Sequence, residues 1–374
     1  MLSYHMNGYS GYGIQYSPFF DDTLAVATGS NFGLVGNGKL FILRIAANGQ
    51  IAESNSFLTI DGLFDVAWNE LNENQVLTAQ GDGSLRLFDV NLQKYPVAIF
   101  KEHQREVFSC SWNLLHKQTF LSSSWDGTVK VWSPSRQQSL NTLIPYSTNS
   151  THICDQNVLK NEIPMSKQLM QQNRSTSNRD CIYQALYSPH DPNIVISCSG
   201  NSYVSIFDIR QPAQTSQQQF IAHKGLEALS CDFNKYRPYV IATGGVDKMV
   251  KTWDLRMIRQ SLLNSRSSPV TTNEMQGHSL AVRKVAWSPH HSNKLLSTSY
   301  DMTCRVWHDL SDGPNGQYSG KTNNSDPQRG CRMIFSKHTE FVFGADWSLW
   351  GEPGYVATAG WDGHVYAWYA LAGQ

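Results

Sequence analysis

The chain has 374 residues, of which 40% are hydrophobic and 11% aromatic, enough for a packed core. Lysine plus arginine and aspartate plus glutamate each number 30, so no net field draws the protein to nucleic acid or to an acidic membrane surface. No stretch approaches the ~20 apolar residues of a membrane span, and the N-terminus lacks the apolar core of a signal peptide. We therefore expect a soluble protein made in the cytosol.

The seven cysteines form no Cys-x-x-Cys pair, and their number is odd. Several lie inside apolar runs, where a small buried hydrophobic residue is the simplest interpretation. We expect reduced thiols in the core, no metal site and no cofactor. The cysteines are Cys110, Cys154, Cys181, Cys198, Cys231, Cys304 and Cys331.

One unit of about 45 residues recurs along the whole chain. In each copy an aromatic residue precedes a turn, a strand rich in serine and threonine, an Asp-Gly-like turn and an alternating strand that ends in a large apolar residue. The clearest copy runs from His103 to Trp132. The seven alternating strands end at Leu43, Phe88, Trp132, Phe207, Trp253, Trp307 and Trp368.

These units predict the four-stranded blades of a propeller. Residues 84–88 and 128–132 alternate with period two, and the Asp-Gly before each supplies a tight turn. No segment keeps helical periodicity, which argues against an α/β enzyme fold. We expect an all-β chain that forms a single seven-bladed β-propeller. The expected blades are residues 11–55, 56–100, 103–144, 180–221, 223–276, 278–336 and 338–374, the last completed by residues 1–8.

The count of strands predicts how the ring closes. Only six residues follow Trp368, too few for the fourth strand of the last blade. Spare extended sequence lies before Gly11, from Leu2 to Met6. The N-terminus is therefore expected to supply the outer strand of the last blade, which leaves no open sheet edge there.

The residues outside the repeat are expected to be loops. Residues 145–179 are rich in asparagine, serine and glutamine and are expected to form a mobile loop between the third and fourth blades. This loop would lie on the rim that carries the Asp-Gly turns. Residues 257–270 and 309–330 fall on the opposite rim.

Four units share a set of histidine, serine or threonine, aspartate and tryptophan. Such a set could suggest a hydrolase triad, but it repeats once per blade, whereas a nucleophile is needed once. The pattern resembles the WD-repeat family, in which these residues are buried and hydrogen-bonded in series. Literal Gly-His and strand-end Trp-Asp each occur only once. The sets are His103, Ser122, Asp126, Trp132; His223, Thr243, Asp247, Trp253; His278, Ser297, Asp301, Trp307; and His338, Thr358, Asp362, Trp368.

In this family the loops that enter the innermost strands share one face with the Asp-Gly turns. We aligned the blades on the aromatic of each innermost strand: Trp68, Trp112, Tyr187, Phe233, Trp287 and Trp347. Acids stand six or seven residues earlier in five of these six blades, although Arg105, Arg179 and Arg283 lie close by. The candidate binding residues are the acids Asp61, Glu106, Asp180, Glu227 and Glu340 and the aromatics Trp125, Tyr300 and Trp361, which precede turns.

This pattern favours a cationic ligand with an apolar face, such as a short amphipathic peptide. Exposed ion pairs contribute only ~0.2–1 kcal/mol each, so the acids would set register and association rate. Burial of a leucine contributes ~1.5–3 kcal/mol, so the aromatics would provide most of the affinity. Scattered surface acids are the alternative explanation for any single one of these residues.

The segment from Gly8 to Phe19 resembles the N-terminus of the receptors for the type-2 peroxisomal targeting signal, the seventh peroxin. Residues 64–68 and 122–132 do so as well, and the likeness to a yeast member covers nearly the whole chain. It implies a cytosolic import receptor for the signal Arg/Lys-Leu-x5-His/Gln-Leu/Ala, whose fixed positions share one helix face. It also implies matrix-enzyme cargo such as thiolase, a co-receptor peroxin, docking peroxins, and cycling from the cytoplasm to the peroxisomal membrane and matrix.

Two other function classes remain open. Phe207-Asp208-Ile209-Arg210 and Trp253-Asp254-Leu255-Arg256 resemble the Trp-Asp-x-Arg box of substrate receptors for cullin ubiquitin ligases. An arginine that closes the bottom of a blade is the favoured explanation, because such short boxes recur by chance in propellers. An enzyme is disfavoured because no glycine-rich phosphate loop, metal-ligand spacing or unique nucleophile is present.

Overall fold

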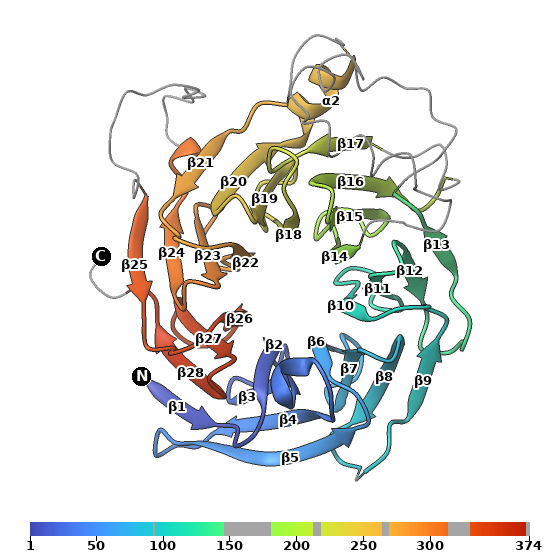
Figure 1. The fold of residues 1–374 in the computed structure, drawn as a ribbon, viewed down its shortest axis with the longest axis vertical. Coiled ribbons are helices and arrows are strands. Elements are labelled where there is room, and N and C mark those ends of the chain that lie inside the picture. Colours follow the sequence, from blue (N-terminus) through green and yellow to red (C-terminus); the bar gives the residue numbers. More distant parts are fainter. Residues whose placement is uncertain (93, 146–180, 212–217, 264–268, 313–329, 372–374) are drawn as a thin grey trace.

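Antiparallel hairpins make up nearly all of the regular structure in the computed structural model, which describes residues 1–92, 94–145, 181–211, 218–263, 269–312 and 330–371. Four strands in sequence form each of six sheets, and three C-terminal strands join the N-terminal strand in the seventh. The seven sheets stand around a central channel, so the predicted seven-bladed propeller is confirmed (Figure 1).

Each blade begins with its innermost strand and ends at the outer edge of the ring. Blades 1 to 3 contain β2 (Ser10–Tyr16), β3 (Thr23–Gly29), β4 (Gly38–Ile45), β5 (Ile51–Thr59); β6 (Leu63–Trp68), β7 (Gln75–Gln80), β8 (Ser84–Asp89), β9 (Ala98–Lys101); and β10 (Val107–Trp112), β11 (Phe120–Ser124), β12 (Val129–Trp132), β13 (Asn141–Leu143). Blades 4 to 7 contain β14 (Ile182–Tyr187), β15 (Ile194–Ser199), β16 (Tyr203–Asp208), β17 (Gln218–Ile221); β18 (Ala228–Phe233), β19 (Val240–Gly245), β20 (Met249–Asp254), β21 (Asn273–Gln276); β22 (Val282–Trp287), β23 (Lys294–Ser299), β24 (Cys304–His308), β25 (Cys331–Phe335); and β26 (Val342–Trp347), β27 (Tyr355–Gly360), β28 (His364–Tyr369), β1 (Leu2–His5).

The hydrophobic core lies between neighbouring blades rather than inside any one of them. Ala25 and Phe57 of blade 1 pack with Trp68 and Phe88 of blade 2, and all four side chains are buried. Equivalent clusters join the other blades. A blade therefore buries its apolar faces only when both neighbours are present, so stability depends on a closed ring.

The ring is closed by the N-terminal strand, as the sequence predicted. Strand β1 pairs with β28 in antiparallel register, from Leu2 opposite Ala367 to His5 opposite His364. The next residue, Met6, donates its backbone N–H to the Gly363 oxygen at 2.7 Å and buries its side chain to 1% exposure. Figure 1 shows β1 lying along the outer side of β28.

Side chains of the innermost strands also link one blade to the next. The Asp65 carboxylate accepts the backbone N–H of Cys110 at 3.1 Å, and Asp346 accepts that of Tyr16 at 2.9 Å. Burial raises the pKa of Asp346 to about 6, and the hydrogen bond from Tyr16 opposes that rise. These bonds fix the spacing of the innermost strands that line the channel.

The histidine of blade 3 lies in a buried polar chain. His103 Nδ1 is 2.8 Å from Asp126, and its Nε2 is 2.7 Å from the Ser122 hydroxyl. That hydroxyl also accepts the indole N–H of Trp132 at 2.8 Å. Blades 5 and 6 contain the same chain through His223, Thr243, Asp247, Trp253 and through His278, Ser297, Asp301, Trp307.

Blade 7 departs from the expected series at its last member. His338 contacts Asp362 and Thr358, each at 3.0 Å, but the buried indole N–H of Trp368 has no hydrogen-bond acceptor among the described residues. The Trp368 ring instead stacks on Phe335 with their centroids 4.5 Å apart. In this blade aromatic stacking replaces the final hydrogen bond.

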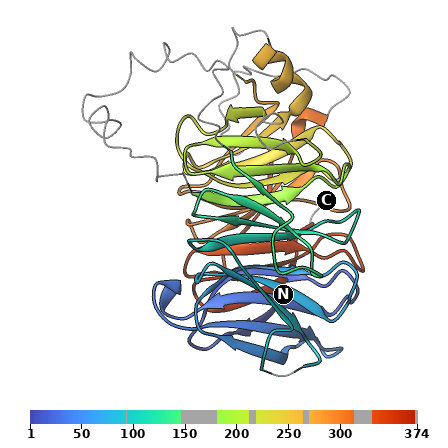
Figure 2. The same cartoon turned by 90° about the vertical axis from the view of Figure 1, so that its right-hand side faces the viewer.

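Several segments differ from the sequence-based expectation. Residues 255–263, expected to be mostly loop, form the helix α2 (Leu255–Leu263) at the outer edge of blade 5, where Ile258 is fully buried (Figure 2). Strand β2 starts at Ser10, and β5 and β9 continue to Thr59 and Lys101, beyond the expected blade limits. Residues 146–180 and 313–329 lie outside the described residues, so the loop expected at 145–179 is not placed. The short helix η3 (Leu310–Asp312) comes directly before the second of these gaps.

In the part of the chain that the structure describes, no helix has the length and apolar character needed to cross a membrane. Six cysteines lie among those residues, and four of them are buried. Cys154 lies outside that part. No group of three or more metal-ligating side chains comes together within the described ranges.

The channel mouth as a candidate peptide-binding surface

Every innermost strand carries a bulge close to its start. In β10 the register shifts between Val107 and Ser109, which leaves Phe108 outside the regular pairing. A bulge bends its strand and changes the direction of the bulged side chain. The seven bulged residues, one per blade, are termed the collar here: Tyr12, Phe64, Phe108, Tyr183, Leu229, Arg283 and Phe343.

Five collar members are aromatic and form a continuous wall. Phe343 and Tyr12 have centroids 5.0 Å apart, and Tyr12 and Phe64 are 5.2 Å apart. Phe64 and Phe108 follow at 5.0 Å, and Phe108 and Tyr183 at 5.7 Å. The wall passes without interruption from blade 7 through blades 1, 2 and 3 to blade 4 and gives the channel an apolar lining.

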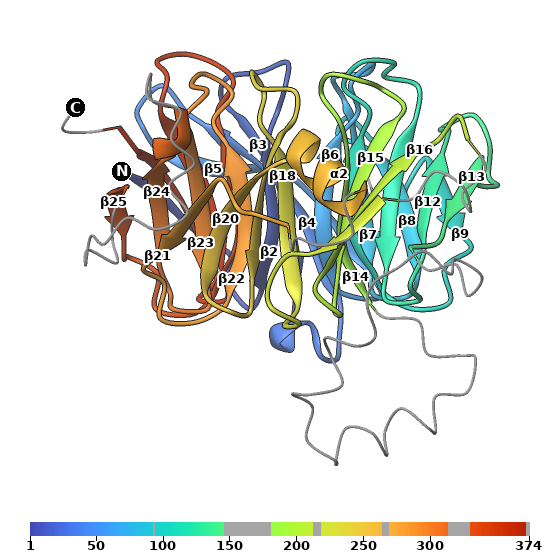
Figure 3. The same cartoon turned by 90° about the horizontal axis from the view of Figure 1, so that it is seen from above.

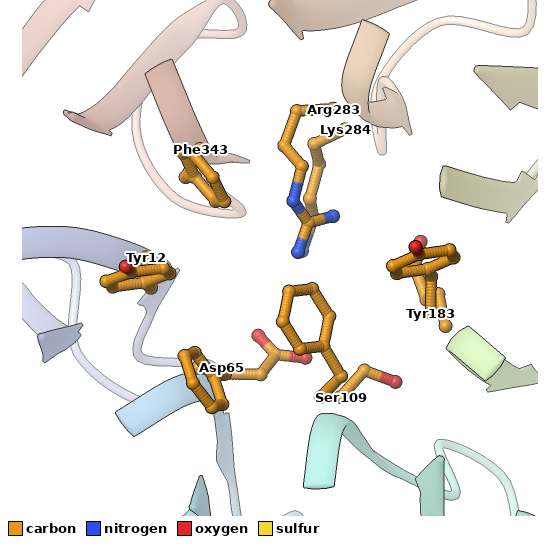
Figure 4. A pocket seen from close by; sticks show the side chains of 10 residues that line it. Tyr12, Asp65, Ser109, Tyr183, Arg283, Lys284 and Phe343 are labelled. Carbon is orange, nitrogen blue, oxygen red and sulfur yellow. The ribbon is translucent and has the colours of Figure 1, made fainter. Parts of the chain in front are cut away.

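The collar also holds a cation. The Arg283 guanidinium lies 4.8 Å from the ring centroid of Phe108 and 5.1 Å from that of Phe343, although these rings come from different sides of the channel. The residue is only 7% exposed. Figure 4 shows its side chain pointing into the centre of the channel, between Phe343 and Tyr183.

The three predicted aromatics extend the collar outward. Trp125 stacks on Phe108 at 5.2 Å, and Trp361 stacks on Phe343 at 4.9 Å. Tyr300 packs edge-on against Phe343 at 5.4 Å. Each is half-buried. The structure thus brings all three into one aromatic cluster, which opens toward the face that carries the Asp-Gly turns, termed the top face here.

The predicted acids stand around this cluster rather than against one another. Asp61, Glu106 and Glu227 are half-buried and Glu340 is exposed, whereas Asp180 lies outside the described residues. Burial raises the pKa of the Tyr183 phenol, and the nearby Glu227 carboxylate raises it further. Glu227 therefore lies near a member of the collar, Tyr183.

One acid is partly neutralised within the molecule. Arg105 Nε lies 3.6 Å from the Glu106 carboxylate, and the same guanidinium lies over the Trp125 ring at 5.7 Å. Both residues are solvent-accessible, so this ion pair is weak and can be exchanged for another cation. Arg105 therefore contacts both a predicted acid and a predicted aromatic of this surface.

Exposed apolar side chains accompany the acids on the top face. Ile60 and Leu226 come directly before Asp61 and Glu227 and are 80% and 47% exposed. The turn η1 (Asn31–Gly33) projects beyond the strand ends and is followed by Leu34, which is 83% exposed (Figure 3). Apolar residues grouped in this way around a mouth are typical of a protein-binding surface.

Comparison with known proteins identifies the family. Residues 94–133 match the model of the WD domain, G-beta repeat, and residues 147–307 match that of the EIPR1 beta-propeller. The peroxisomal targeting signal 2 receptor of Saccharomyces cerevisiae is 58% identical over 99% of this chain and 100% of its own length. Those of Komagataella phaffii and Mus musculus are 50% and 33% identical, over 98% and 95% of this chain and 98% and 92% of their own.

The chain belongs to the family of peroxisomal targeting signal 2 receptors. Its relatives are receptors built on WD repeats, which confirms the prediction of a receptor rather than an enzyme.

Within this receptor fold, the Trp-Asp-x-Arg-like boxes hold arginines that are already paired. Arg256 Nη2 and Nε donate to Asp254 at 2.6 and 3.0 Å, and Arg210 makes the same two-pronged contact with Asp208. Each arginine thus bonds the aspartate two residues before it.

Sequence reasoning missed the collar of this receptor. Six of the seven collar residues stand four positions before the strand-end aromatics on which the blades were aligned, as Phe64 stands before Trp68 and Arg283 before Trp287. The predicted acids stand at the outer loop positions, six or seven residues before the same aromatics. The regular alternation of a strand also predicts the wrong direction for the side chain at this position, because the bulge shifts the register there.

Proposed function

We propose that this chain binds the type-2 peroxisomal targeting signal on its top face. The signal is an amphipathic helix of the form Arg/Lys-Leu-x5-His/Gln-Leu/Ala, whose fixed residues form one basic and apolar stripe. The observation that supports this most strongly is the coincidence of acids and exposed apolar residues around the aromatic mouth. Asp61 beside Ile60 and Glu227 beside Leu226 repeat that combination in two blades.

The two kinds of residue have different roles in this proposal. The acids attract the basic residue of the signal and fix its register, since partly exposed charge pairs add only ~0.2–1 kcal/mol each. The leucines of the signal pack on exposed apolar side chains and on the rim aromatics Trp125 and Trp361, and each buried leucine adds ~1.5–3 kcal/mol. Specificity then requires both a cation and two apolar side chains at fixed helical spacing.

The receptor role extends to delivery. We propose that the chain meets matrix proteins such as thiolase in the cytoplasm, acts with a co-receptor peroxin, and delivers its cargo to docking peroxins at the peroxisomal membrane. Cycling between cytoplasm and peroxisome, membrane and matrix included, belongs to the same proposal. The similarity to receptors named for this signal supports it.

The test is a direct binding measurement. A fluorescent helix of the form Arg-Leu-x5-His-Leu is titrated with the purified chain, alone and with cell extract, and followed by anisotropy. A peptide with glutamate in place of its arginine, and one with serine in place of both leucines, serve as matched controls. We expect binding of the first peptide and at least tenfold weaker binding of both controls. Equal binding of all three would refute the proposal.

A further inference from the structure

Arg283 is the one charged member of the collar, and within the described residues its guanidinium contacts aromatic rings but forms no ion pair. The residue as a whole is more than nine-tenths buried, and its guanidinium packs against the faces of Phe108 and Phe343. Among the described residues, no carboxylate, carbonyl or hydroxyl oxygen accepts a hydrogen bond from it. Buried arginines normally have acceptors for their five N–H groups, because an unpaired buried charge is costly.

The residues that line the pocket around this guanidinium include more cations than anions. Lys284 is the next residue on the same strand and lines the same pocket, together with Asp65. The Asp65 carboxylate accepts the backbone N–H of Cys110 at 3.1 Å, so part of its acceptor capacity is already used. The pocket therefore holds two cations and one anion, in contrast to the acids that surround it on the top face.

We propose that Arg283 binds a carboxylate from an acidic residue of a polypeptide that docks across the channel mouth. The planar guanidinium matches a carboxylate in a two-pronged hydrogen bond. The aromatic collar would pack on the methylene groups of the entering side chain and exclude water, which strengthens the charge interaction. One carboxylate can accept hydrogen bonds from the N–H groups of Arg283 that lack an acceptor among the described residues, and its negative charge balances the positive charge of the guanidinium.

The surrounding surface indicates why the ligand is a peptide carboxylate. Asp61, Glu106 and Glu227 stand around the entrance and repel a free dianion such as phosphate more strongly than a monoanion. Exposed Ile60, Leu226 and Leu34 lie on the same face and provide contacts for the residues next to the acid. The basic and apolar stripe of the targeting signal supplies no anion, so this site goes beyond the proposed signal recognition.

The site can be tested without any targeting signal. The probes are acetyl-Leu-Glu-Leu-amide, its glutamine counterpart and sodium acetate, each titrated into the full chain labelled with ¹⁵N-arginine. The Nε–H resonance of Arg283 is assigned by its loss in Arg283→Gln. We expect this resonance to shift saturably with the glutamate peptide, at a midpoint roughly tenfold lower than with the glutamine peptide or with acetate.

Matched variants show which arginine is responsible. Arg283→Lys keeps the charge but loses the planar fork, so the midpoint for the glutamate peptide should rise several-fold. Arg105→Gln removes an exposed arginine of the same face and should leave the midpoint unchanged. Melting curves of each variant establish that it is folded, and the wild-type titration needs a variant only for the assignment of the Arg283 resonance.

Three results would overturn the proposal. They are no shift of the Arg283 resonance with the glutamate peptide, equal midpoints for the glutamate and glutamine peptides, and an equal midpoint for acetate, which would indicate a site for small anions. Failure of the targeting-signal helix to bind would contradict the proposed function and leave this result unaffected, because none of the probes contains the signal.

Discussion

The hydroxyl of Ser122 bonds two buried side chains at once. It lies 2.7 Å from His103 Nε2 and accepts the indole N–H of Trp132 at 2.8 Å. Asp126 at Nδ1 fixes the orientation of the imidazole. A serine of about 0% exposure thus connects the Asp-Gly turn to the third strand of its blade.

Replacing Ser122 with alanine should destabilise the protein by ~2–4 kcal/mol, because His103 and Trp132 are each left with an unpaired polar group. The matched control is Ser133→Ala, since that hydroxyl bonds only Ser135 near the surface. Chemical denaturation of both variants provides the measurement. Similar losses in the two would show that the buried chain contributes little.

Whereas Ser122 stabilises the fold, the carboxylate of Asp346 destabilises it at neutral pH. Burial raises its pKa to about 6 in the folded chain, against an unfolded value near 3.8. The folded state therefore holds this proton more tightly, and the cost of ionising Asp346 grows as pH rises from about 4 to above 6.

Replacing Asp346 with asparagine should accordingly raise the stability at pH 7.5 by ~1–2 kcal/mol and change it little at pH 4. The amide oxygen can still accept the Tyr16 N–H, so the inter-blade bond is kept. Melting temperatures of both proteins across this pH range test the sign. A stabilisation that stays constant with pH would rule out the ionisation of Asp346 as its cause.

Residues that recur in several repeats could be predicted from the sequence more readily than residues that depart from the repeat in a single blade. The histidine sets were visible because they recur, and the structure bonds three of them in full series. Arg283 and Trp368 depart from their repeats, and their roles depend on which rings pack beside them. Such packing is set by distant blades and leaves no local pattern.

The N-terminal strand is the element on which ring closure depends. Strand β1 covers the outer edge of β28, and Met6 adds a fully buried side chain to the cluster shared by blades 7 and 1. Without β1 the backbone groups of β28 would form an open sheet edge.

Deletion of residues 1–7 should lower the melting temperature by about 5 °C or more, since it removes a paired strand and a buried methionine worth roughly 3 kcal/mol together. Deletion of residues 372–374 is the control. Differential scanning calorimetry and hydrogen exchange at the amides of β28 are the measurements. An unchanged melt with protected β28 amides would contradict closure by β1.

The elements themselves were largely readable from the sequence. Strands showed a period of two between turn residues, and seven such units could be counted directly. Helix α2 was missed because Leu255 and Ile258 offer only about one turn of helical spacing before a serine-rich stretch. Its position depends on Ile258, which is buried in the cluster that joins blades 4 and 5.

For the whole molecule, charge is balanced in total and uneven in distribution. Acids and apolar side chains surround the mouth of the top face, whereas the channel below holds Arg283 and Lys284. The proposed signal would meet the acids first, and a second carboxylate-bearing segment would reach the centre. The net charge of zero indicates neither the acidic mouth nor the cations in the channel. The acids became apparent only when the blades were aligned with one another.

The central claim is that the acids of the top face receive a basic amphipathic helix. Glu106 and Glu227 occupy the same aligned position in blades 3 and 5, so reversing both, as Glu106→Lys and Glu227→Lys, replaces two attractions with repulsions. The expected loss is ~1–4 kcal/mol. The control is the double variant Glu73→Lys and Glu352→Lys, which makes the same charge change at two exposed positions in loops of the opposite face.

The measurement is the affinity of the Arg-Leu-x5-His-Leu helix for both double variants at low and high salt. We predict a loss of roughly five- to several-hundred-fold for the Glu106 and Glu227 pair, which shrinks at high salt, and wild-type affinity for the control pair. A helix with glutamate in place of its arginine should regain part of the binding to the first variant. Wild-type affinity of the original helix for that variant at low salt would contradict the account.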